Sequence, residues 1–297
     1  MDRRAGLGAQ LAPCYRRSVK LSVVIPALDE AAHIENAVRG AFDAPSDPAD
    51  VEVIVVDGGS ADATASLASA AGARVILFER GRARQLQAGV RASGGDVLLL
   101  LHADTRLPRG WASAVRSALR DERVVGGAFR FRFDERSAVL RFIELGARLR
   151  SGLFRLPYGD QALFVRRRAL EAIGGIPDVP LMEDLDLVQR IKREGRLALL
   201  AAPAVTSARR YIEAGPLRAM LRHWLAAAAW TLGVDRRRIA HWSNRTPQDS
   251  TPVGVASNGV HLFDFARPPD GLRSPSARCA KLALAARAAA RRLRAGR

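Results

Sequence analysis

The stretch VEVIVVDGGSADATASLASAAGARVILFE, residues 51–79, decides the fold class. Its first six residues are apolar except for one glutamate, which is typical of a strand buried on both faces. The alanine-rich segment at 62–73 favours a helix with Asp62 as its N-cap, and the run at 74–79 indicates a second strand. A strand, a helix and a strand at this spacing predict two parallel strands joined by a crossover helix.

The same alternation continues on both sides of this stretch. Upstream, LSVVIPA at 21–27 predicts a buried strand, and residues 29–42 have helical spacing. Downstream, residues 82–95 predict a helix that ends at a glycine pair, and DVLLLLHAD at 96–104 predicts another strand. Together these segments predict an α/β fold with a mostly parallel sheet flanked by helices.

From residue 124 onward the alternation is less regular, although strands and helices are still expected. These are a strand with one exposed face at 124–134, a helix at 137–153, a strand turning into a short helix at 158–175, a helix at 182–195 that ends at Gly195, a strand at 196–211 and a helix at 216–233 that begins at Pro216.

Composition divides the chain into three expected parts. Residues 1–19 form a flexible basic tail, residues 20–235 form one α/β domain, and residues 236–297 form an extension. The extension is rich in Pro, Ser, Gly and Asn at 244–278, so it is expected to be largely irregular, with a basic terminal helix.

The charge and the cysteine content bound the setting of the protein. The formal net charge is +17, which attracts phosphates, nucleic acids and anionic membranes, but genome composition accounts for it equally well. The arginines are scattered without an aromatic stacking platform, so no nucleic-acid partner is expected. Cys14 and Cys279 lie near opposite ends and form neither a disulfide framework nor a zinc motif, which favours a reduced, cytoplasmic setting. No apolar run reaches 18 residues, so no membrane span is expected.

Acidic and polar residues follow three of the expected parallel strands. The first strand leads into Glu30, the second into Asp57 and Gly58, and the fourth into His102 and Asp104. Ligands bind at the carboxyl ends of parallel strands, so these residues predict one shared site. Motifs of the types G-x-x-x-x-G-K-[ST] and G-x-G-x-x-G are absent, which argues against a P-loop and a dinucleotide fold.

Two further segments carry charged groups at expected helix starts. Arg82 and Arg84 begin the helix at 82–95 and form either an anion site or a solvated basic face. Glu183, Asp184 and Asp186 lie in the first turn of the helix at 182–195, where acids complement the helix dipole. Three acids exceed what a helix start needs, so one of them is a candidate general base, while Asp186 is expected to point elsewhere.

Four segments in this order, SVVIPALDE, VIVVDGGSADAT, GDVLLLLHADT and MEDLDLVQRIKREG, resemble the inverting nucleotide-sugar glycosyltransferases of family 2. The resemblance covers residues 20–235 and implies the GT-A fold, a Rossmann-like mixed sheet with additional C-terminal helices. The segments GRARQLQAG, LHADTRLP, PYGDQALFVRR and SARRY are most similar to a bacterial subgroup named for its genomic association with radical-SAM and selenocysteine-containing proteins. The implied reaction transfers a sugar from a nucleotide-sugar donor, UDP-linked by family habit, to an acceptor hydroxyl or carboxyl with inversion.

The resemblance also assigns roles to individual residues. Asp184 is the implied general base with Glu183 beside it, and Asp104 matches the last acid of the D-x-D motif that binds Mg²⁺ or Mn²⁺. Gly159 and Asp160 are expected either to border the sugar or acceptor or to form a structural turn. The residues expected to bind the nucleotide sugar are Pro26, Leu28, Glu30, Asp57, Gly58, Arg82, Gln85, His102 and Ala103.

The sequence departs from the family pattern at His102, which stands where the first acid of D-x-D is expected. This histidine is interpreted as a hydrogen-bond partner of the ribose or a phosphate, as a metal ligand, or as a wall residue. Because it replaces an acid of the motif, the sequence is also compatible with a transferase that has lost its activity. The sequence is also compatible with a sugar nucleotidyltransferase, although that class usually has a glycine-rich basic signature after the first strand, and with a non-catalytic binder of nucleic acid or anionic membrane. The acceptor stays open, with a lipid-like one among the options. The segment 217–234 and the basic C-terminus suggest a peripheral contact with the inner face of the plasma membrane.

Overall fold

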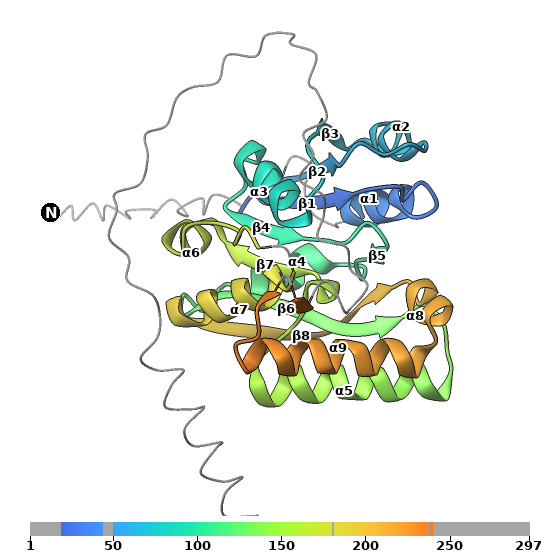
Figure 1. Ribbon diagram of the computed structural model, residues 1–297. Coiled ribbons are helices and arrows are strands. Elements are labelled where there is room, and N and C mark those ends of the chain that lie inside the picture. The colour runs from blue at the N-terminus through green and yellow to red at the C-terminus, as the bar shows by residue number, and fades with distance from the viewer. Residues whose placement is uncertain (1–18, 44–49, 180, 237, 240–297) are drawn as a thin grey trace, which may run out of the picture.

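Eight strands form one mixed sheet in the order β3-β2-β1-β4-β7-β6-β8-β5, with helices on both faces (Figure 1). The structure is a computed structural model, and it describes residues 19–43, 50–179, 181–236 and 238–239. The strands are β1 (Leu21–Ala27), β2 (Val51–Asp57), β3 (Arg74–Leu77), β4 (Val97–Leu100), β5 (Thr105–Arg106), β6 (Val124–Phe133), β7 (Leu163–Arg166) and β8 (Arg196–Thr206).

The described helices are α1 (Ile34–Phe42), α2 (Thr64–Ala70), α3 (Arg82–Ala92), α4 (Trp111–Ala118), α5 (Ala138–Phe154), α6 (Arg167–Ala172), α7 (Glu183–Glu194), α8 (Arg209–Ala214) and α9 (Pro216–Thr231). The longest of them are α5 and α9. A 3₁₀ turn at Gly159–Gln161 precedes β7. In Figure 1, α5 and α9 run side by side below the sheet, at the opposite end of the molecule from β3 and α2.

The first half of the sheet consists of the parallel strands β3, β2, β1 and β4. Successive residues along β1 point into two different cores, because helices cover both faces of the sheet. Val23 and Ile25 pack with α1 and α4, whereas Val24 packs on the other face with α3. The continuous apolar runs of β1, β2 and β4 follow from this arrangement, since both faces of these three strands are covered, whereas β3 at the edge of the sheet is partly exposed.

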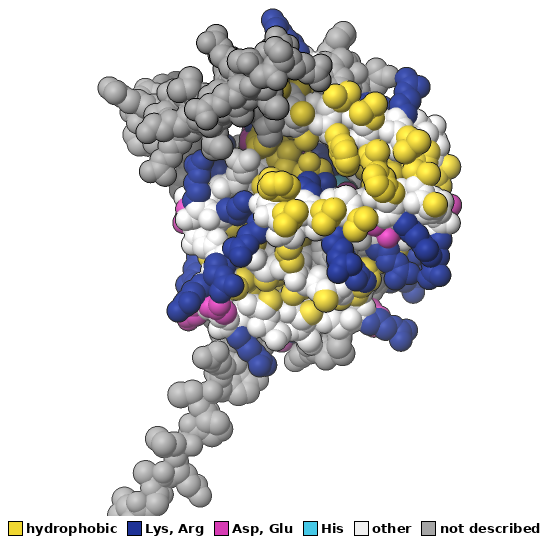
Figure 2. Space-filling model, turned by 90° about the horizontal axis from the view of Figure 1, so that it is seen from below, with side chains coloured by type: hydrophobic (Ala, Val, Ile, Leu, Met, Phe, Trp, Pro, Cys, Tyr) yellow, Lys and Arg dark blue, Asp and Glu magenta, His cyan; other side chains and the backbone are white. Residues whose placement is uncertain are grey.

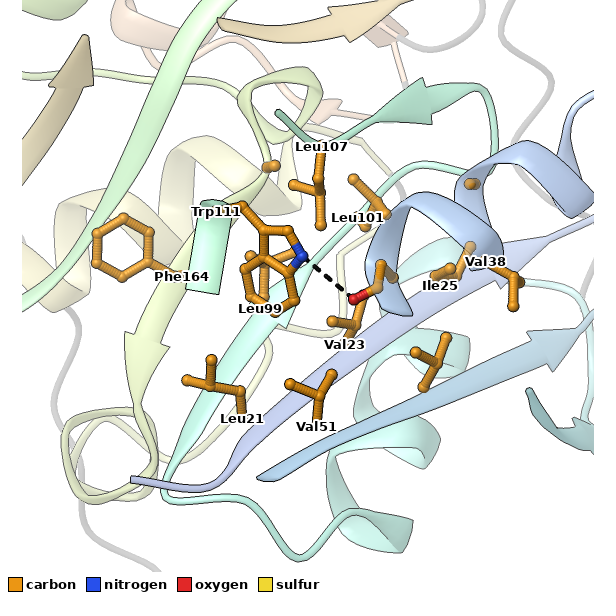
Figure 3. Packing of buried hydrophobic residues seen from close by; sticks show 14 of the residues in the cluster. Leu21, Val23, Ile25, Val38, Val51, Leu99, Leu101, Leu107, Trp111 and Phe164 are labelled. Carbon is orange, nitrogen blue, oxygen red and sulfur yellow. Dashed lines mark hydrogen bonds between the residues drawn. The ribbon is translucent and has the colours of Figure 1, made fainter. Parts of the chain in front are cut away.

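Trp111 anchors the first of these cores (Figure 3). Its side chain is fully buried, and its indole nitrogen donates a hydrogen bond of 3.2 Å to the carbonyl of Ala41 in α1. A buried indole needs such a partner for its N–H group. The contact therefore fixes α4 against α1.

The second half of the sheet is mixed. β7 is antiparallel to both β4 and β6, and β6 is parallel to β8. A Cβ atom at Gly127 of β6 would overlap the carbonyl of Ala198 and lie 2.5 Å from Cζ of Phe164, so only glycine allows this close packing. A separate apolar cluster around Phe131 and Phe133 joins β6 to α5.

The predicted sheet with parallel strands and flanking helices is confirmed, and several local predictions need correction. Helix α4 and the short strand β5 were not expected. The strand expected at 196–211 ends at Thr206, and residues 209–214 are helical, because Asp134 accepts the N–H of Ala208 just before α8. Residue Ala63, not Asp62, is the N-cap of α2. The strand that was expected to have one exposed face, β6, is buried along most of its length, and Arg130 is its one exposed side chain.

The terminal tail and most of the extension lie outside the described residues, as do both cysteines. The described residues just beyond 235 pack onto the domain. Arg236 donates to a carboxylate oxygen of Asp186 at 2.6 Å and to the carbonyl of Leu181, and Ile239 is buried against Leu181 and Ala226. None of the helices among the described residues has both the length and the apolar character to cross a bilayer.

Candidate active site

The site lies where the carboxyl ends of β1 and β4 meet the starts of α3 and α7 and the 3₁₀ turn at Gly159–Gln161. These segments are far apart in the sequence, yet each contributes a side chain or backbone group to the same two recesses. Four residues line both recesses: Arg82, His102, Glu183 and Asp184. Of the strand-end residues expected to share one site, Pro26 and His102 line a recess together with Glu183 and Asp184, whereas Glu30, Asp57 and Asp104 line neither of these two recesses.

Arg82 is the central cation of the site. Its Nε lies 3.0 Å from Oε1 of Glu183, which is 8% exposed, and its Nη2 contacts Nε2 of His102. Burial by itself lowers the pKa of Arg82, but the negative charges of Glu183, Asp184, Asp160 and Asp104 outweigh it and raise the pKa. The guanidinium is therefore a permanent positive charge held among acids.

His102 accepts a hydrogen bond from this guanidinium. An arginine side chain has donors and no acceptor, so Nε2 of His102 must carry its lone pair toward Nη2 of Arg82. Nε2 of His102 is thus occupied by an arginine, which distinguishes this residue from the free carboxylate that a D-x-D motif would offer at this position.

Asp184 is held by backbone groups at the start of α7. Its Oδ2 accepts the N–H of Gly159 at 2.8 Å, and its Oδ1 accepts the N–H of Leu185 at 2.9 Å. The preceding residue, Met182, has a φ of 62°, an unusual value for a residue with a side chain. Such positions concentrate at functional sites, where the surrounding structure fixes them.

Gly159 permits the close contact between the 3₁₀ turn and the central cation. A Cβ atom at this position would overlap Nη2 of Arg82 and lie 2.9 Å from Nε2 of His102 and 3.4 Å from Oδ2 of Asp184. The backbone of the turn thus takes the space that a side chain would fill. The sequence left two interpretations of Gly159, as a site residue and as a turn residue. The structure is compatible with both, because Gly159 begins the 3₁₀ turn and its lack of a side chain leaves room for Arg82.

Asp160 presents an unusual carboxylate near Asp184. Its Oδ1 is buried and has no hydrogen-bond partner among the described residues, and its side chain lines the larger recess. Burial raises the pKa of Asp160 to about 6; Arg150 opposes this shift and Asp184 adds to it. A buried acceptor without a donor is expensive, which favours a ligand group as its partner.

Asp57 and Gln85, both expected to contact the nucleotide, have internal partners. Oδ2 of Asp57 accepts the N–H groups of Gly59 and Ser60 at 3.1 and 2.9 Å, and Oδ1 contacts the hydroxyl of Ser60. Nε2 of Gln85 donates to the carbonyls of Ala27 and Val56 at 2.9 and 2.8 Å, so it joins the ends of β1 and β2. A Cβ atom at Gly58 would lie 3.1 Å from the same amide nitrogen.

Glu30 is 5% exposed and forms ion pairs with two arginines of α8. Oε2 lies 3.3 Å from Nη2 of Arg209, and Oε1 contacts Nη2 of Arg210. These two arginines were not assigned a role in the sequence, although the segment SARRY contains them. They connect the loop after β1 with the far half of the sheet.

The remaining nucleotide-site candidates lie around the same edge. Pro26 lines the smaller recess, Leu28 is half-buried and Ala103 is buried. Asp104 is half-buried, and among the described residues its carboxylate has a single hydrogen-bond contact, a long one of 3.5 Å from the hydroxyl of Thr105. Its charge acts on Arg82 and on Asp160, although Asp104 lines neither of the two recesses.

The two recesses differ in character. The smaller one reaches from the four shared residues toward Pro26 and Leu101 at the ends of β1 and β4. The larger one has an empty volume of about 880 Å³, its open mouth included, and extends toward α5 and α9. The acids Asp160, Glu183 and Asp184 line it, and Phe131, Ile143 and Met220 form an apolar wall.

Several residues of the larger recess were missed in the sequence. Arg150 stacks on the ring of Tyr158 at 3.3 Å, and the hydroxyl of Tyr211 hydrogen-bonds Nδ1 of His223 at 3.1 Å. Burial raises the pKa of the Tyr158 hydroxyl, and Arg150 opposes the shift. Arg150, Tyr211 and His223 come from α5, α8 and α9, and Tyr158 precedes the 3₁₀ turn, so only the three-dimensional arrangement brings them together in the lining of this recess.

Comparisons with known proteins agree with this geometry. Residues 22–172 match the family model described as Glycosyl transferase family 2, whereas no curated protein matches the chain. The mannosyltransferase PcManGT from Pyrobaculum calidifontis, in complex with GDP-Man and Mn²⁺, is similar with a TM-score of 0.53 and 20% identity, over 73% of this chain and 65% of that one.

Two other solved structures show the same likeness. One is S. aureus TarS 1–349 in complex with UDP-GlcNAc, with a TM-score of 0.52 and 14% identity over 64% of this chain and 58% of that one. The other is glucosyl-3-phosphoglycerate synthase from Mycobacterium tuberculosis with Mn²⁺, UDP and glucosyl-3-phosphoglycerate, with a TM-score of 0.51 and 23% identity over 73% and 81%. This chain thus spans less than two thirds of the first two proteins. At these identities the likeness shows the fold, and the GT-A fold is confirmed.

Proposed function

The chain belongs to glycosyl transferase family 2, and from that premise we propose that it transfers a sugar from a nucleotide-linked donor to an acceptor in the larger recess. The observation that carries the proposal is the junction of the two recesses at Arg82, Glu183 and Asp184. A transferase needs two adjoining substrate sites with the reacting groups between them. We also propose that it belongs to the bacterial subgroup that shares the segments GRARQLQAG and PYGDQALFVRR.

The donor is proposed to bind in the smaller recess and at the edge formed by β1, β2 and β4, with its diphosphate toward Arg82. A guanidinium is suited to phosphate oxygens because its donors lie in one plane. UDP is our proposed nucleotide, with Asp57 and the loop after β1 beside the base and ribose. Solved structures with this fold hold UDP-GlcNAc in one case and GDP-Man in another.

The reaction is proposed to proceed with inversion at the anomeric carbon. The acceptor oxygen attacks C1 of the sugar, and its proton passes to the carboxylate of Asp184. The bond between C1 and the diphosphate oxygen breaks, and its electron pair stays on the departing nucleoside diphosphate. The N–H groups of Gly159 and Leu185 hold the Asp184 carboxylate in place, and Glu183 positions Arg82 through their ion pair.

A divalent cation fits the site only as a partner of the diphosphate. Among the described residues, no cluster of three or more His, Cys, Asp or Glu side chains could hold a metal ion. Asp104 offers one lightly engaged carboxylate, and Mg²⁺ is commonly held by one or two carboxylates together with substrate phosphates and water. We propose that Asp104 holds Mg²⁺ or Mn²⁺ in this way. When bound, the ion would neutralise charge on the departing diphosphate.

The acceptor is proposed to be lipid-like and the enzyme to work at the cytoplasmic surface of a membrane. The support for this is the apolar wall that Phe131, Ile143 and Met220 form in the larger recess. That wall would accommodate an apolar group of the acceptor next to the reacting hydroxyl. Residues 20–235 are proposed to form the catalytic unit.

Replacing Asp184 with asparagine tests the proposed base. Asp184→Asn keeps the size of the side chain and one of the two hydrogen bonds from the N–H groups of Gly159 and Leu185, because the amide nitrogen cannot accept the other, and it removes the proton acceptor. We expect UDP with Mn²⁺ to raise the melting temperature as in the parent, while sugar transfer falls by about 10²–10⁴-fold.

Asp186→Asn is the matched control, since Asp186 lies in the same helical turn and pairs with Arg236 outside both recesses. It should leave the transfer rate within about twofold of the parent, because no reacting group is changed. Transfer by Asp184→Asn at the parental rate would show that another group is the base.

A further inference from the structure

The outer surface of α5 is apolar although it faces away from the sheet. Leu140, Ile143 and Ala147 of this helix are buried in the domain. A second apolar row lies on the opposite side of the helix at spacings of three and four residues, and each of its members is at least half exposed. It consists of Phe142, Leu145, Leu149 and Leu153. A surface helix normally carries polar residues on that side.

Helix α9 continues this surface. It packs beside α5, with Met220 in the same apolar cluster as Ile143 (Figure 1). Its own exposed apolar residues are Leu217, Leu221, Trp224 and Leu225. The two rows define the α5–α9 face. An exposed apolar patch that spans two helices marks an interaction surface rather than scattered surface residues.

Arginines border the apolar rows. Arg141 and Arg148 lie seven residues apart on α5, and Arg218 and Arg222 lie four apart on α9. Figure 2 views this side of the molecule and shows basic side chains beside the hydrophobic ones. The only acid of the two helices is Glu144, which accepts the N–H of Phe133. The face thus combines apolar residues with positive charge.

The combination of apolar rows with arginines indicates which kind of partner the face would bind. Apolar rows with arginine borders are the pattern of helices that lie in the interface of an anionic bilayer, where the arginine stems extend along the surface and their heads meet phosphates. A protein partner would find eight large apolar side chains but no acid or amide on the rows to orient it. Trp224 is 55% exposed on the face and also lines the larger recess, so the face adjoins the proposed acceptor site.

We propose that the α5–α9 face docks on an anionic phospholipid surface. The docking is derived from the face alone; only its use, to bring the larger recess to a membrane-borne acceptor, rests on the proposed function.

The test is flotation of the full chain with vesicles of phosphatidylcholine, with or without phosphatidylglycerol. We expect the parent to float with the anionic vesicles. Leu149→Glu/Leu221→Glu and Arg148→Glu/Arg218→Glu should each reduce the bound fraction about tenfold or more, since the first removes inserted apolar groups and the second reverses the attracted charge.

Matched controls are Leu77→Glu, at a leucine that is 72% exposed on β3, and Arg91→Glu, at an exposed arginine of α3. Both lie at the other end of the molecule (Figure 1) and should float like the parent. Equal loss in the controls, or parental flotation of both face variants, would overturn the proposal. The UDP-induced rise in melting temperature separates the two hypotheses: its absence in a parent that floats contradicts the proposed function and leaves the docking supported.

A photo-reactive residue at position 149 of the full chain identifies what covers the face. Crosslinks to phospholipid in the presence of anionic vesicles support the proposal. Crosslinks to residues 240–297 of the same chain, or to a second copy, that persist in the presence of those vesicles would overturn it.

Discussion

At the scale of single residues, the site depends on a cation surrounded by acids. Arg82 contacts Glu183 and His102, and the charges of Asp104, Asp160 and Asp184 act on it. Each acid gains from the shared guanidinium, and the arginine remains charged in a partly enclosed site. Changes that shift the guanidinium should therefore affect catalysis more than folding.

Gly159→Ala should separate these two effects. The new methyl group would overlap Nη2 of Arg82, which is the far end of a flexible side chain and can move aside. We expect the fold to persist and sugar transfer to fall by about 10–100-fold, since the displaced guanidinium loses its alignment. Circular dichroism and transfer assays measure the two quantities. Gly152→Ala on α5 is the control, because no atom lies within 4 Å of its added Cβ, and parental activity is expected.

Asp160 should make stability depend on pH. Its folded pKa of about 6 is raised above the ordinary value of 3.8, so the native state binds the proton more tightly than the unfolded chain. The stability conferred by the protonated form is complete below pH 4 and is lost as the pH rises through about 6. Asp160→Asn should thus be more stable than the parent at pH 7 by about 1–3 kcal/mol, with the difference disappearing near pH 4.

Urea denaturation at several pH values measures this difference. Asp178→Asn is the control, since the Asp178 side chain is 73% exposed, and it should follow the parent at every pH. A constant difference between Asp160→Asn and the parent from pH 4 to 7 would contradict the assigned shift.

At the scale of elements, α3 positions residues at the edge of the sheet that is proposed to bind the donor. It lies directly on β1 and β2, because Gly89 leaves no room between them. A Cβ atom there would overlap Cγ1 of Val24 and lie 3.0 Å from Cγ2 of Val56. From this position α3 presents Arg82 at its first turn and directs Gln85 to the ends of both strands.

Gly89→Ala should therefore destabilise the domain, in contrast to Gly159→Ala. The obstructing atoms belong to stiff, buried valines, so the helix must move away from the sheet. We expect a loss of about 1–3 kcal/mol in the free energy of unfolding, measured by urea denaturation. Gly40→Ala on α1 is the control, with its nearest neighbour at 3.9 Å, and it should be neutral or slightly stabilising.

At the scale of the whole molecule, two halves of one sheet form the two recesses. The parallel half supplies the strand ends at Pro26 and His102, and the mixed half supplies the 3₁₀ turn and supports α5. The ion pairs of Glu30 with Arg209 and Arg210 connect the halves across the site. The α5–α9 face lies on the second half, beside the mouth of the larger recess.

The sequence by itself determined the parallel half of the fold. Period and apolar runs are local properties, so the alternation at 21–104 was predictable, as was the position of Asp184 at the start of a helix; the roles of Asp104 and Asp184 remain predictions. The same local reasoning missed α4 and α8, and it could not tell that Asp57 and Gln85 have internal partners.

Only the tertiary structure decided which groups share a wall. Arg150, Tyr211 and His223 come from three helices, and no spacing in the sequence relates them. The burial of Asp160 and the contact of His102 with Arg82 likewise arise from segments folded together over long separations. Polar contacts between such segments depend on distances of a few ångströms, whereas the pattern of apolar residues fixes only which face of each element is buried.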